Sequence, residues 1–496
     1  MTSVVIVVFD GLQPSQVTPE LMPNLSALAS SGVTFTNHHP VYPSVTRANV
    51  ASMVTGRSPG GHGLAANRLM VRDFDPNQCI SALEPELSQI AKTTGRVLLA
   101  PTLAEILSRH GRQYMAVGAG TSGNAYLQSP RAEEFGGATI HPDFTLPRSV
   151  SRELFDRFGP WPDEARPNTR RMAHCLRIFT EYILAERNPS VSLIWSSEPD
   201  KSQHDAPVGS ALSKAAIQEA DAQLGKLMDW LRRAGREAET DVMVASDHGY
   251  STISETINVE GSVREAGFSV GGEPGGVPGA VVVATNGGSA LFYTRPGDQD
   301  TAQRLASWLM SQSWCGNLTV SDSVGEIPGT LPGSLVGNQG LRCPDIAMSF
   351  RWDSTANGWG YPGMVYSTGG VPGNGQHGSM SKHEMNNVLI AWGPSFKQNV
   401  TVDTPSGNVD LAPTVLQILG ITDGPPMDGR ILEEALAGST APKSLIRGAP
   451  EVRPTETHHA EHRLGQQVYS QWIKVSRVGT TVYVDAGNGG LGLRNA

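Results

Sequence analysis

The chain contains few cysteines. Only four of its 496 residues are cysteine, at positions 79, 175, 315 and 343. This number and spacing exclude a disulfide scaffold and a zinc site built on CxxC pairs. A chain of this length can bury a large core without cross-links or a metal that drives folding. We therefore expect reduced thiols in a soluble, cytoplasmic protein.

Basic residues are outnumbered, and long apolar runs are missing. Lys and Arg total 38 against 47 acidic residues, so the formal net charge is −9. A nucleic-acid binder needs basic stripes to neutralise phosphates, so no nucleic-acid polymer is expected as a partner. No stretch reaches the about 18 apolar residues of a membrane span. The first apolar run ends at Phe9 and the first basic residue is Arg47, which does not resemble a secretory signal.

Short apolar runs alternate with amphipathic stretches along most of the chain. Strands are predicted at residues 4–9, 114–118, 191–195, 241–245 and 388–392, and helices at 23–31, 102–110, 170–187, 213–234 and 411–419. Continuous β-branched runs such as 4–9 are typical of strands that are buried on both faces of a parallel sheet. The alternation predicts an α/β fold, namely a three-layer sandwich with a mainly parallel central sheet.

The pattern changes twice. Between about 255 and 345 it becomes Gly-rich with two short strands and a helix near 301–311, which indicates an inserted α+β segment. The core pattern then returns until about residue 421. We expect a catalytic domain over 1–425 and a C-terminal extension over 426–496, the latter ending in a hairpin of 472–477 and 481–484.

Metal-ligating residue types follow the predicted strands. Asp10 follows the first strand, Asp200 and His204 lie in SSEPDKSQH, Asp247 and His248 lie in SDHG, and His377 lies in GQHGS. Each alone would be interpreted as a turn or capping residue. Ligands of doubly wound sheets bind at the carboxyl ends of the strands, and we expect all six side chains to meet there. Asp and His are the ligands that zinc prefers when no cysteine is used.

If the predicted metal site belongs to a hydrolase, the chain must supply a nucleophile in addition to the metal ligands. The loop YPSVTRAN, residues 42–49, precedes a predicted helix and offers Ser44, Thr46 and Asn49. A hydroxyl at a helix N-terminus faces the positive end of the helix dipole, where anions collect. Without the metal ligands, Thr46 would be interpreted as an ordinary N-cap.

These motifs together resemble the alkaline phosphatase superfamily, and most closely its nucleotide pyrophosphatase/phosphodiesterase (type I phosphodiesterase) branch. The resemblance covers about residues 3–421 and rests on motifs that occur in order: VVIVVFDGLQP, MPNLSALASSGVTFTN, YPSVTRAN, SMVTGRSPGGHGLAAN, EPDKSQH, SDHG, GQHGS, GPSF and DLAPTVLQILGI. It implies an alkaline-phosphatase-like sandwich and hydrolysis of phosphoric esters.

The resemblance also assigns roles to the site residues. One zinc would be held by Asp200, His204 and His377, and a second by Asp10, Asp247 and His248. Thr46 would bridge the two metals and act as the nucleophile, passing through a phosphothreonine. Manganese or iron would also suit Asp and His ligands.

Two further residues concern the substrate. Asn67, in GLAAN, matches the position whose side-chain amide contacts a non-bridging phosphate oxygen. The residue after the nucleophile is typically aromatic in nucleotide-hydrolysing members, but here it is Arg47. A guanidinium suits a base, a carboxylate or a second phosphate. A small phosphorylated or phosphonate substrate is expected, without a membrane partner, and an oligomer is compatible with the sequence.

Several alternatives stay open. A phosphonoacetate hydrolase-like enzyme that cleaves C–P bonds uses the same metals and a Thr nucleophile, but the lysines that bind its substrate carboxylate are not located here. A phosphomonoesterase needs only different groups around the outer phosphate oxygens. An inactive metal-binding scaffold is the non-enzymatic alternative, although no ligand and no nucleophile has been lost from the motifs.

Overall fold

A ten-stranded mixed sheet forms the centre of the protein. The structure, a computed structural model, describes residues 2–271, 278–439 and 455–492. The strand order is β21-β2-β20-β9-β1-β8-β5-β6-β7, with β22 also paired to β2. The strands are β1 (Ser3–Phe9), β2 (Val33–His39), β5 (Tyr114–Gly118), β6 (Ala138–Ile140), β7 (Thr145–Leu146), β8 (Val191–Ser196), β9 (Thr240–Ala245), β20 (Asn387–Trp392), β21 (Val400–Val402) and β22 (Ser406–Gly407). Most pairings are parallel, whereas β20 runs antiparallel to both of its neighbours.

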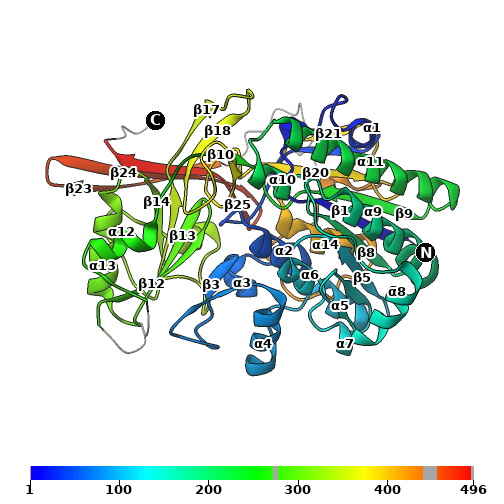
Figure 1. Ribbon diagram of the computed structural model, residues 1–496, viewed down its shortest axis with the longest axis horizontal. Helices are drawn as coiled ribbons and strands as arrows, with labels where there is room; N and C mark the ends of the chain where they lie inside the picture. The colour runs from blue at the N-terminus through cyan, green and yellow to red at the C-terminus, as the bar shows by residue number, and fades with distance from the viewer. Residues whose placement is uncertain (1, 272–277, 440–454, 493–496) are drawn as a thin grey trace.

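Helices cover both faces of this sheet, which gives the three layers visible in Figure 1. One face packs against α1 (Pro23–Ser31), α8 (Ser151–Phe158), α9 (Thr169–Arg177), the π-helical stretch η3 (Ile178–Arg187) and α11 (Ala211–Arg233). The other packs against α2 (Thr46–Thr55), α4 (Glu84–Thr94), α5 (Leu103–Arg109), α6 (Ser122–Gln128) and α14 (Leu411–Ile418). Alternate side chains of β1 enter each layer, so a strand buried on both faces must be apolar throughout.

A second lobe lies in the chain between the core strands β9 and β20. Its six-stranded sheet has the order β11-β12-β13-β16-β14-β15. This insertion lobe consists of α12 (Val259–Glu265), β11 (Ser269–Val270), β12 (Ala280–Asn286), β13 (Ser289–Thr294), α13 (Gln299–Met310), β14 (Cys315–Val320), β15 (Leu331–Pro332), η4 (Gly333–Val336) and β16 (Ile346–Phe350). Its own apolar cluster includes Phe292, Leu305 and Phe350.

Smaller elements complete the fold. A four-stranded sheet has the order β17-β18-β10-β19, from β10 (Ser251–Thr256), β17 (Trp352–Ala356), β18 (Pro362–Ser367) and β19 (Gly375–Gln376). A hairpin pairs β3 (Arg68–Met70) with β4 (Cys79–Ser81). Short helical turns are η1 (Pro14–Gln16), α3 (Pro59–His62), α7 (Ala132–Phe135), η2 (Arg148–Val150), α10 (Asp200–Asp205), η5 (Asn408–Asp410) and η6 (Glu433–Ala435).

The C-terminal residues form a three-stranded sheet, where the sequence predicted a two-stranded hairpin. Its strands are β23 (Thr455–Leu464), β24 (Gln467–Val478) and β25 (Thr481–Leu491), and β23 projects at the left of Figure 1. The sheet is anchored to the insertion lobe, because the Gln471 side chain accepts from Leu318 N–H at 2.9 Å and donates to Gly329 O at 2.6 Å. The apolar residues of β23 are Ala460 and Leu464, which are too few to form an apolar alternation, and sequence reasoning therefore missed this strand.

The predicted fold class is confirmed, and each strand and helix predicted in the α/β core is present. The helix predicted over 170–187 is α-helical only to Arg177 and π-helical beyond it. The domain boundaries at 425 and around the insertion stay predictions. Within the part of the chain that the structure describes, no helix is both long and apolar enough to cross a membrane.

Candidate metal and catalytic site

Three carboxylates meet at the carboxyl ends of three adjacent parallel strands. Asp10 follows β1, Asp247 follows β9 and Asp200 follows β8, and the sheet order places β1 between the other two. Asp10 and Asp247 are 4% and 0% exposed. This geometry follows from the parallel topology, which gathers strand-end loops at one edge of the sheet.

The three histidines reach the same place by different routes. His248 follows Asp247 directly, and His204 lies one turn after Asp200 on α10. His377 follows β19, which belongs to the four-stranded sheet and pairs with β10. The expectation that all six residues follow strands of one sheet was therefore wrong for His377, because β19 pairs with β10 in a sheet separate from the central one. The rings of His248 and His377 stack at 3.7 Å between centroids.

The ligand atoms form two clusters that share His248. Asp200, His248 and His377 make one, and Asp10, Asp247 and His248 make the other, each with ligand atoms within 4.8 Å of one another. His204 lies beside the first cluster, with Nε2 3.2 Å from Asp200 Oδ1. Each cluster has the composition of a site for a divalent cation.

The hydrogen bonds of two histidines leave their Nε2 atoms free for a cation. His377 Nδ1 lies 2.8 Å from Ser44 O, and His248 Nδ1 lies 3.0 Å from Gly249 O. A carbonyl can only accept, so each Nδ1 carries the proton and each Nε2 presents a lone pair. Those lone pairs face carboxylate oxygens: His377 Nε2 lies 3.5 Å from Asp200 Oδ1, and His248 Nε2 lies 3.3 Å from Asp247 Oδ2. A metal ion between them satisfies both acceptors.

Unpartnered oxygens and shifted pKa values support the same conclusion. Asp10 Oδ1 and Asp247 Oδ2 are buried without a hydrogen-bond partner. Burial, and then the negative charges of Asp247 and Asp200, raise the pKa of Asp10 well above its usual range. Burial likewise raises the pKa of Asp247 and holds the pKa of His377 well below its usual range. Buried carboxylates crowded in this way need compensating positive charge, and the residues present fit two divalent cations.

Thr46 lies at the junction of the two clusters. It is the first residue of α2, and its Oγ1 is 3.5 Å from His248 Nε2. The side chain is 6% exposed, so the hydroxyl sits in a largely water-free position at the positive end of the helix dipole. The arrangement offers an alcohol oxygen beside two cation positions, which suits nucleophilic attack on an electrophile that carries negative charge.

Asn67 and Arg47 are linked to each other beside Thr46. Asn67 Oδ1 accepts from the backbone N–H of Arg47 at 2.9 Å, which leaves the side-chain NH₂ group of Asn67 to donate elsewhere. Arg47 is partly buried, and its Nε has no hydrogen-bond partner. Burial lowers the pKa of Arg47, and the charges of Asp10, Asp200 and Asp247 act against that shift.

Sequence reasoning missed two residues that hold the carboxylates. Trp195 Nε1 donates to Asp10 Oδ2 at 3.0 Å, and the Tyr250 hydroxyl donates to Asp200 Oδ1 at 2.8 Å. The signal for Trp195 was available, since it ends the predicted strand 191–195, which pairs with the strand that precedes Asp10. Tyr250 directly follows SDHG, and nothing in that spacing indicates its reach across to Asp200.

Other polar residues of the motifs have structural contacts. His38 bonds Ser406 and Asn408, and His62 bonds Ser52. Asn49 accepts from Val41 N–H at 2.8 Å, so it holds the nucleophile loop. These side chains are buried beside the site without reaching it.

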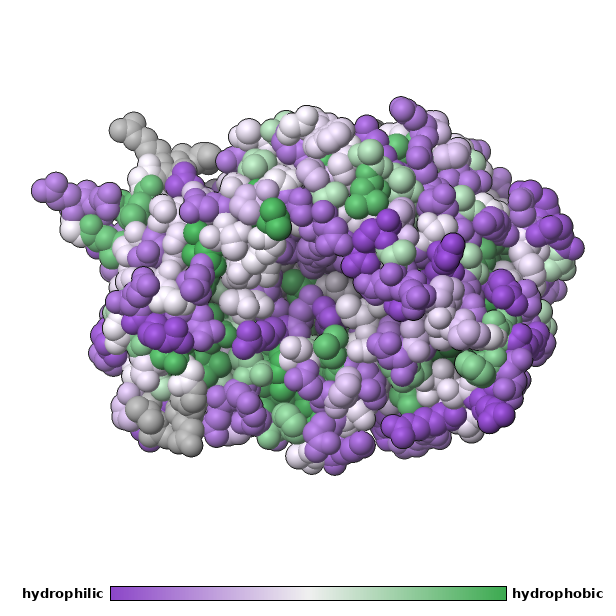
Figure 2. Space-filling view, viewed as in Figure 1, coloured by the Kyte–Doolittle hydropathy of each residue, from purple (hydrophilic) through white to green (hydrophobic). Residues whose placement is uncertain are grey.

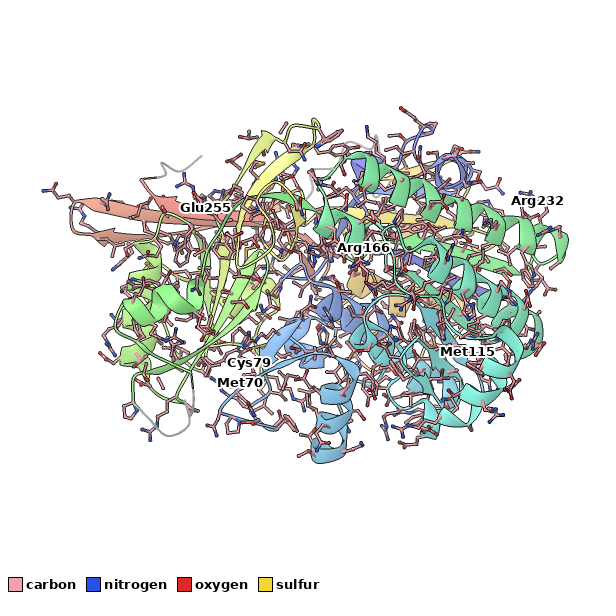
Figure 3. All side chains as sticks on the ribbon, in the orientation of Figure 1. Met70, Cys79, Met115, Arg166, Arg232 and Glu255 are labelled. Carbon is pink, nitrogen blue, oxygen red and sulfur yellow. The ribbon has the colours of Figure 1, made fainter. Side chains whose placement is uncertain are left out.

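The surroundings of the site carry paired charges. Lys201 bonds Glu164, which also pairs with Arg166 at 2.8 Å, and Arg166 pairs with Asp205 at 2.7 Å. Figure 3 shows Arg166 near the middle of the view. The molecular surface is hollowed near the middle of the same face, between the insertion lobe and the α/β core (Figure 2).

Known proteins are similar to this chain in sequence and in fold. The family model described as type I phosphodiesterase / nucleotide pyrophosphatase matches residues 4–374. An ectonucleotide pyrophosphatase/phosphodiesterase of Caenorhabditis elegans, C27A7.3, is 23% identical over 432 residues, covering 84% of this chain and 47% of the relative. Mouse family member 3 is 24% identical over 254 residues, covering 51% of this chain and 25% of the relative. The chain thus spans about half, or less, of the length of these relatives.

The solved structure of murine ectonucleotide pyrophosphatase/phosphodiesterase 5, an inactive variant in complex with AMP, superposes with a TM-score of 0.61. It shares 20% sequence identity, covers 88% of this chain and is itself covered completely. This likeness shows the fold. Because the family model spans most of the sequence, the chain belongs to the type I phosphodiesterase / nucleotide pyrophosphatase family, a branch of the alkaline phosphatase superfamily.

Proposed function

We propose that this protein is a di-zinc phosphodiesterase that acts through a phosphothreonine on Thr46. The observation that carries the proposal is the 3.5 Å separation between Thr46 Oγ1 and His248 Nε2, where His248 belongs to both ligand clusters. The nucleophile thus lies within reach of both cation positions.

Asp200, His204 and His377 would hold one zinc, and Asp10, Asp247 and His248 the other. Zinc supplies Lewis-acid stabilisation of negative charge when bound. Manganese and iron accept the same ligand types. Trp195 and Tyr250 orient the carboxylates by hydrogen bonds, which fixes the direction of their remaining lone pairs.

Hydrolysis proceeds in two displacements. Thr46 Oγ1 attacks phosphorus, the Oγ1–P bond forms, the bond from phosphorus to the leaving-group oxygen breaks, and the leaving group departs with the proton that Thr46 gives up. Water then attacks the phosphothreonine, its oxygen bonds to phosphorus, the P–Oγ1 bond breaks, and Thr46 takes a proton from that water. Asn67 donates its free amide N–H to a non-bridging oxygen, while its carbonyl oxygen stays on Arg47 N–H.

The substrate is a small phosphodiester, and Arg47 bears on which one. Its guanidinium has an unpartnered Nε and stands next to the nucleophile, so it suits a second anionic group of the substrate. The AMP in the murine family member 5 complex supports a substrate of nucleotide size. Lys201 is engaged by Glu164, so it is not free for the substrate carboxylate that a C–P hydrolase must bind.

A substrate panel tests the proposal. We expect bis(p-nitrophenyl) phosphate to be cleaved faster than p-nitrophenyl phosphate by protein loaded with zinc, and again with manganese. Faster monoester cleavage would favour the phosphomonoesterase, and phosphate release from phosphonoacetate would favour the C–P hydrolase. Protein that binds less than one metal per chain and gains no activity with added zinc would support the inactive scaffold. The cytoplasmic location also stays a proposal, for which cell fractionation is the measurement.

A further inference from the structure

Glu384 is a buried carboxylate at the back of the candidate site. It is 0% exposed and lies in the loop between β19 and β20, in a turn closed by Glu384 N–H to Ser381 O at 2.9 Å. Its Oε2 accepts from Ser379 N–H at 2.6 Å, and its Oε1 accepts from the Ser379 hydroxyl at 2.6 Å. Ser379 is two residues after His377, so Glu384 fixes the loop that carries this histidine.

The same carboxylate reaches the nucleophile loop. Glu384 Oε2 lies 3.1 Å from the hydroxyl of Ser44, two residues before Thr46. That hydroxyl also lies 2.9 Å from Ser379 O and accepts from Gly378 N–H at 3.0 Å. The Ser44 carbonyl in turn accepts from His377 Nδ1. Ser44 therefore joins the two loops through its side chain and its backbone.

A third segment of the site is attached to the backbone of this turn. Gly249 N–H donates to Glu384 O at 2.8 Å, and Tyr250 N–H donates to His383 O at 3.0 Å. A Cβ atom on Gly249 would lie 2.2 Å from His383 O, so the approach is close enough to require glycine. Because Gly249 follows His248, the turn at 381–385 contacts all three segments that supply His248, His377 and Thr46.

The chemistry of this position favours a functional explanation. A carboxylate buried at 0% exposure costs free energy that an apolar side chain would not. Burial raises the pKa of Glu384, and hydrogen bonds from serines, Ser379 first among them, act in the opposite direction. A carboxylate offers acceptors in two directions at once, as is needed to hold two loops that each present a donor.

We propose that Glu384 is a positioning residue, which sets Thr46 against His377 and His248 by way of Ser44 and Ser379. We call the contacts of Glu384 with Ser44 and Ser379 the brace. The inference rests on the proposed function, because it assumes that the brace serves phosphoryl transfer. Displacement of a reacting group by about 1 Å can cost about 100-fold in rate, so loss of the brace acts on turnover.

Steady-state kinetics of Glu384→Ala, Glu384→Gln and Ser44→Ala test the proposal. We expect kcat to fall about 10- to 100-fold in Glu384→Ala and in Ser44→Ala, with KM changed less than threefold. Glu384→Gln keeps one acceptor oxygen and should recover most of the loss. The double variant Ser44→Ala/Glu384→Ala should be no slower than Glu384→Ala, because both changes break one connection.

A matched control separates positioning from stability. Glu434 is also 0% exposed and accepts from Arg430 at 2.9 Å, away from the site. Glu434→Gln should lower Tm without changing kcat. If Glu384→Ala and Ser44→Ala also lower only Tm, or if their losses in kcat multiply in the double variant, the proposal is overturned.

The positioning role of Glu384 can also be tested by a measurement that needs no turnover and so does not depend on the proposed function. The visible absorption of Co²⁺-loaded protein reports ligand geometry, and we expect it to change in Ser44→Ala and Glu384→Ala but not in Glu434→Gln. If the wild-type protein cleaves no phosphodiester, the proposed function fails while the spectra still test the brace. Identical spectra in all four proteins would overturn the brace itself.

Discussion

His377 Nδ1 lies 2.8 Å from the carbonyl oxygen of Ser44, so a candidate metal ligand is bonded directly to the backbone of the nucleophile loop. The contact places the proton of His377 on Nδ1 and directs the Nε2 lone pair at Asp200. It also ties the position of Thr46, two residues later, to the position of His377. The candidate metal site and the proposed nucleophile are therefore directly connected through this hydrogen bond.

Removal of the Thr46 hydroxyl should abolish turnover and spare metal binding. Thr46→Ala is expected to lower kcat for bis(p-nitrophenyl) phosphate by about 1,000-fold or more, because it removes the alcohol oxygen that lies beside His248 Nε2. Thr46→Ser keeps the hydroxyl and should retain measurable turnover. Metal analysis should give the wild-type content for both variants. Substantial activity in Thr46→Ala would remove it as the nucleophile.

Loss of a proposed ligand should lower the metal content. Asp247→Ala and His377→Ala each remove one member of a different cluster, so each should bind about one zinc fewer per chain than the wild type. Elemental analysis after dialysis measures this directly. His62→Gln is the matched control, since His62 bonds Ser52 outside both clusters. Unchanged zinc in a ligand variant would exclude that residue from the ligand set.

Arg47 should discriminate between substrates. Arg47→Ala is expected to reduce kcat/KM about 10- to 100-fold for a diphosphate diester such as NAD⁺, because charge-assisted hydrogen bonds to the second phosphate are lost. The loss for bis(p-nitrophenyl) phosphate, which has no second anion, should be less than threefold. Equal losses on both substrates would show that Arg47 contacts the scissile phosphate or only supports the loop.

His62 should make the fold sensitive to acid. Burial lowers the pKa of His62 to about 3, and its Nδ1 accepts from Leu64 N–H at 3.1 Å, which a proton there would prevent. In the unfolded chain, His62 binds a proton near pH 6.5. The contribution of neutral His62 to the free energy of unfolding is therefore fully present above this pH and is lost as the pH falls towards 3. His62→Gln should therefore reduce the slope of the unfolding free energy by about 1.4 kcal/mol per pH unit between those values.

Urea unfolding at pH 4 to 7 measures that slope. A slope that is the same in His62→Gln and in the wild type would mean that His62 is protonated in the folded protein over this range.

Part of the candidate site could be predicted from the sequence. Asp10, Asp200 and Asp247 each follow an apolar run, and a parallel sheet brings such positions to one edge. The position of His377 could not be predicted from the sequence in this way, since it depends on how β19 pairs with β10 in a separate sheet. Glu384 carries no local signal, because its partners Ser44 and Ser379 are chosen by loop packing and not by sequence spacing.

The sequence by itself determined the family, the α/β class and the residue types that gather at the strand ends, because apolar periodicity and motif order are local properties. Only the tertiary structure decided that His248 belongs to both clusters, that Thr46 lies beside this shared histidine, and that Glu384 joins three segments of the site. Those relationships depend on distances between loops far apart in the chain, and such distances are set by sheet pairing and by buried hydrogen bonds.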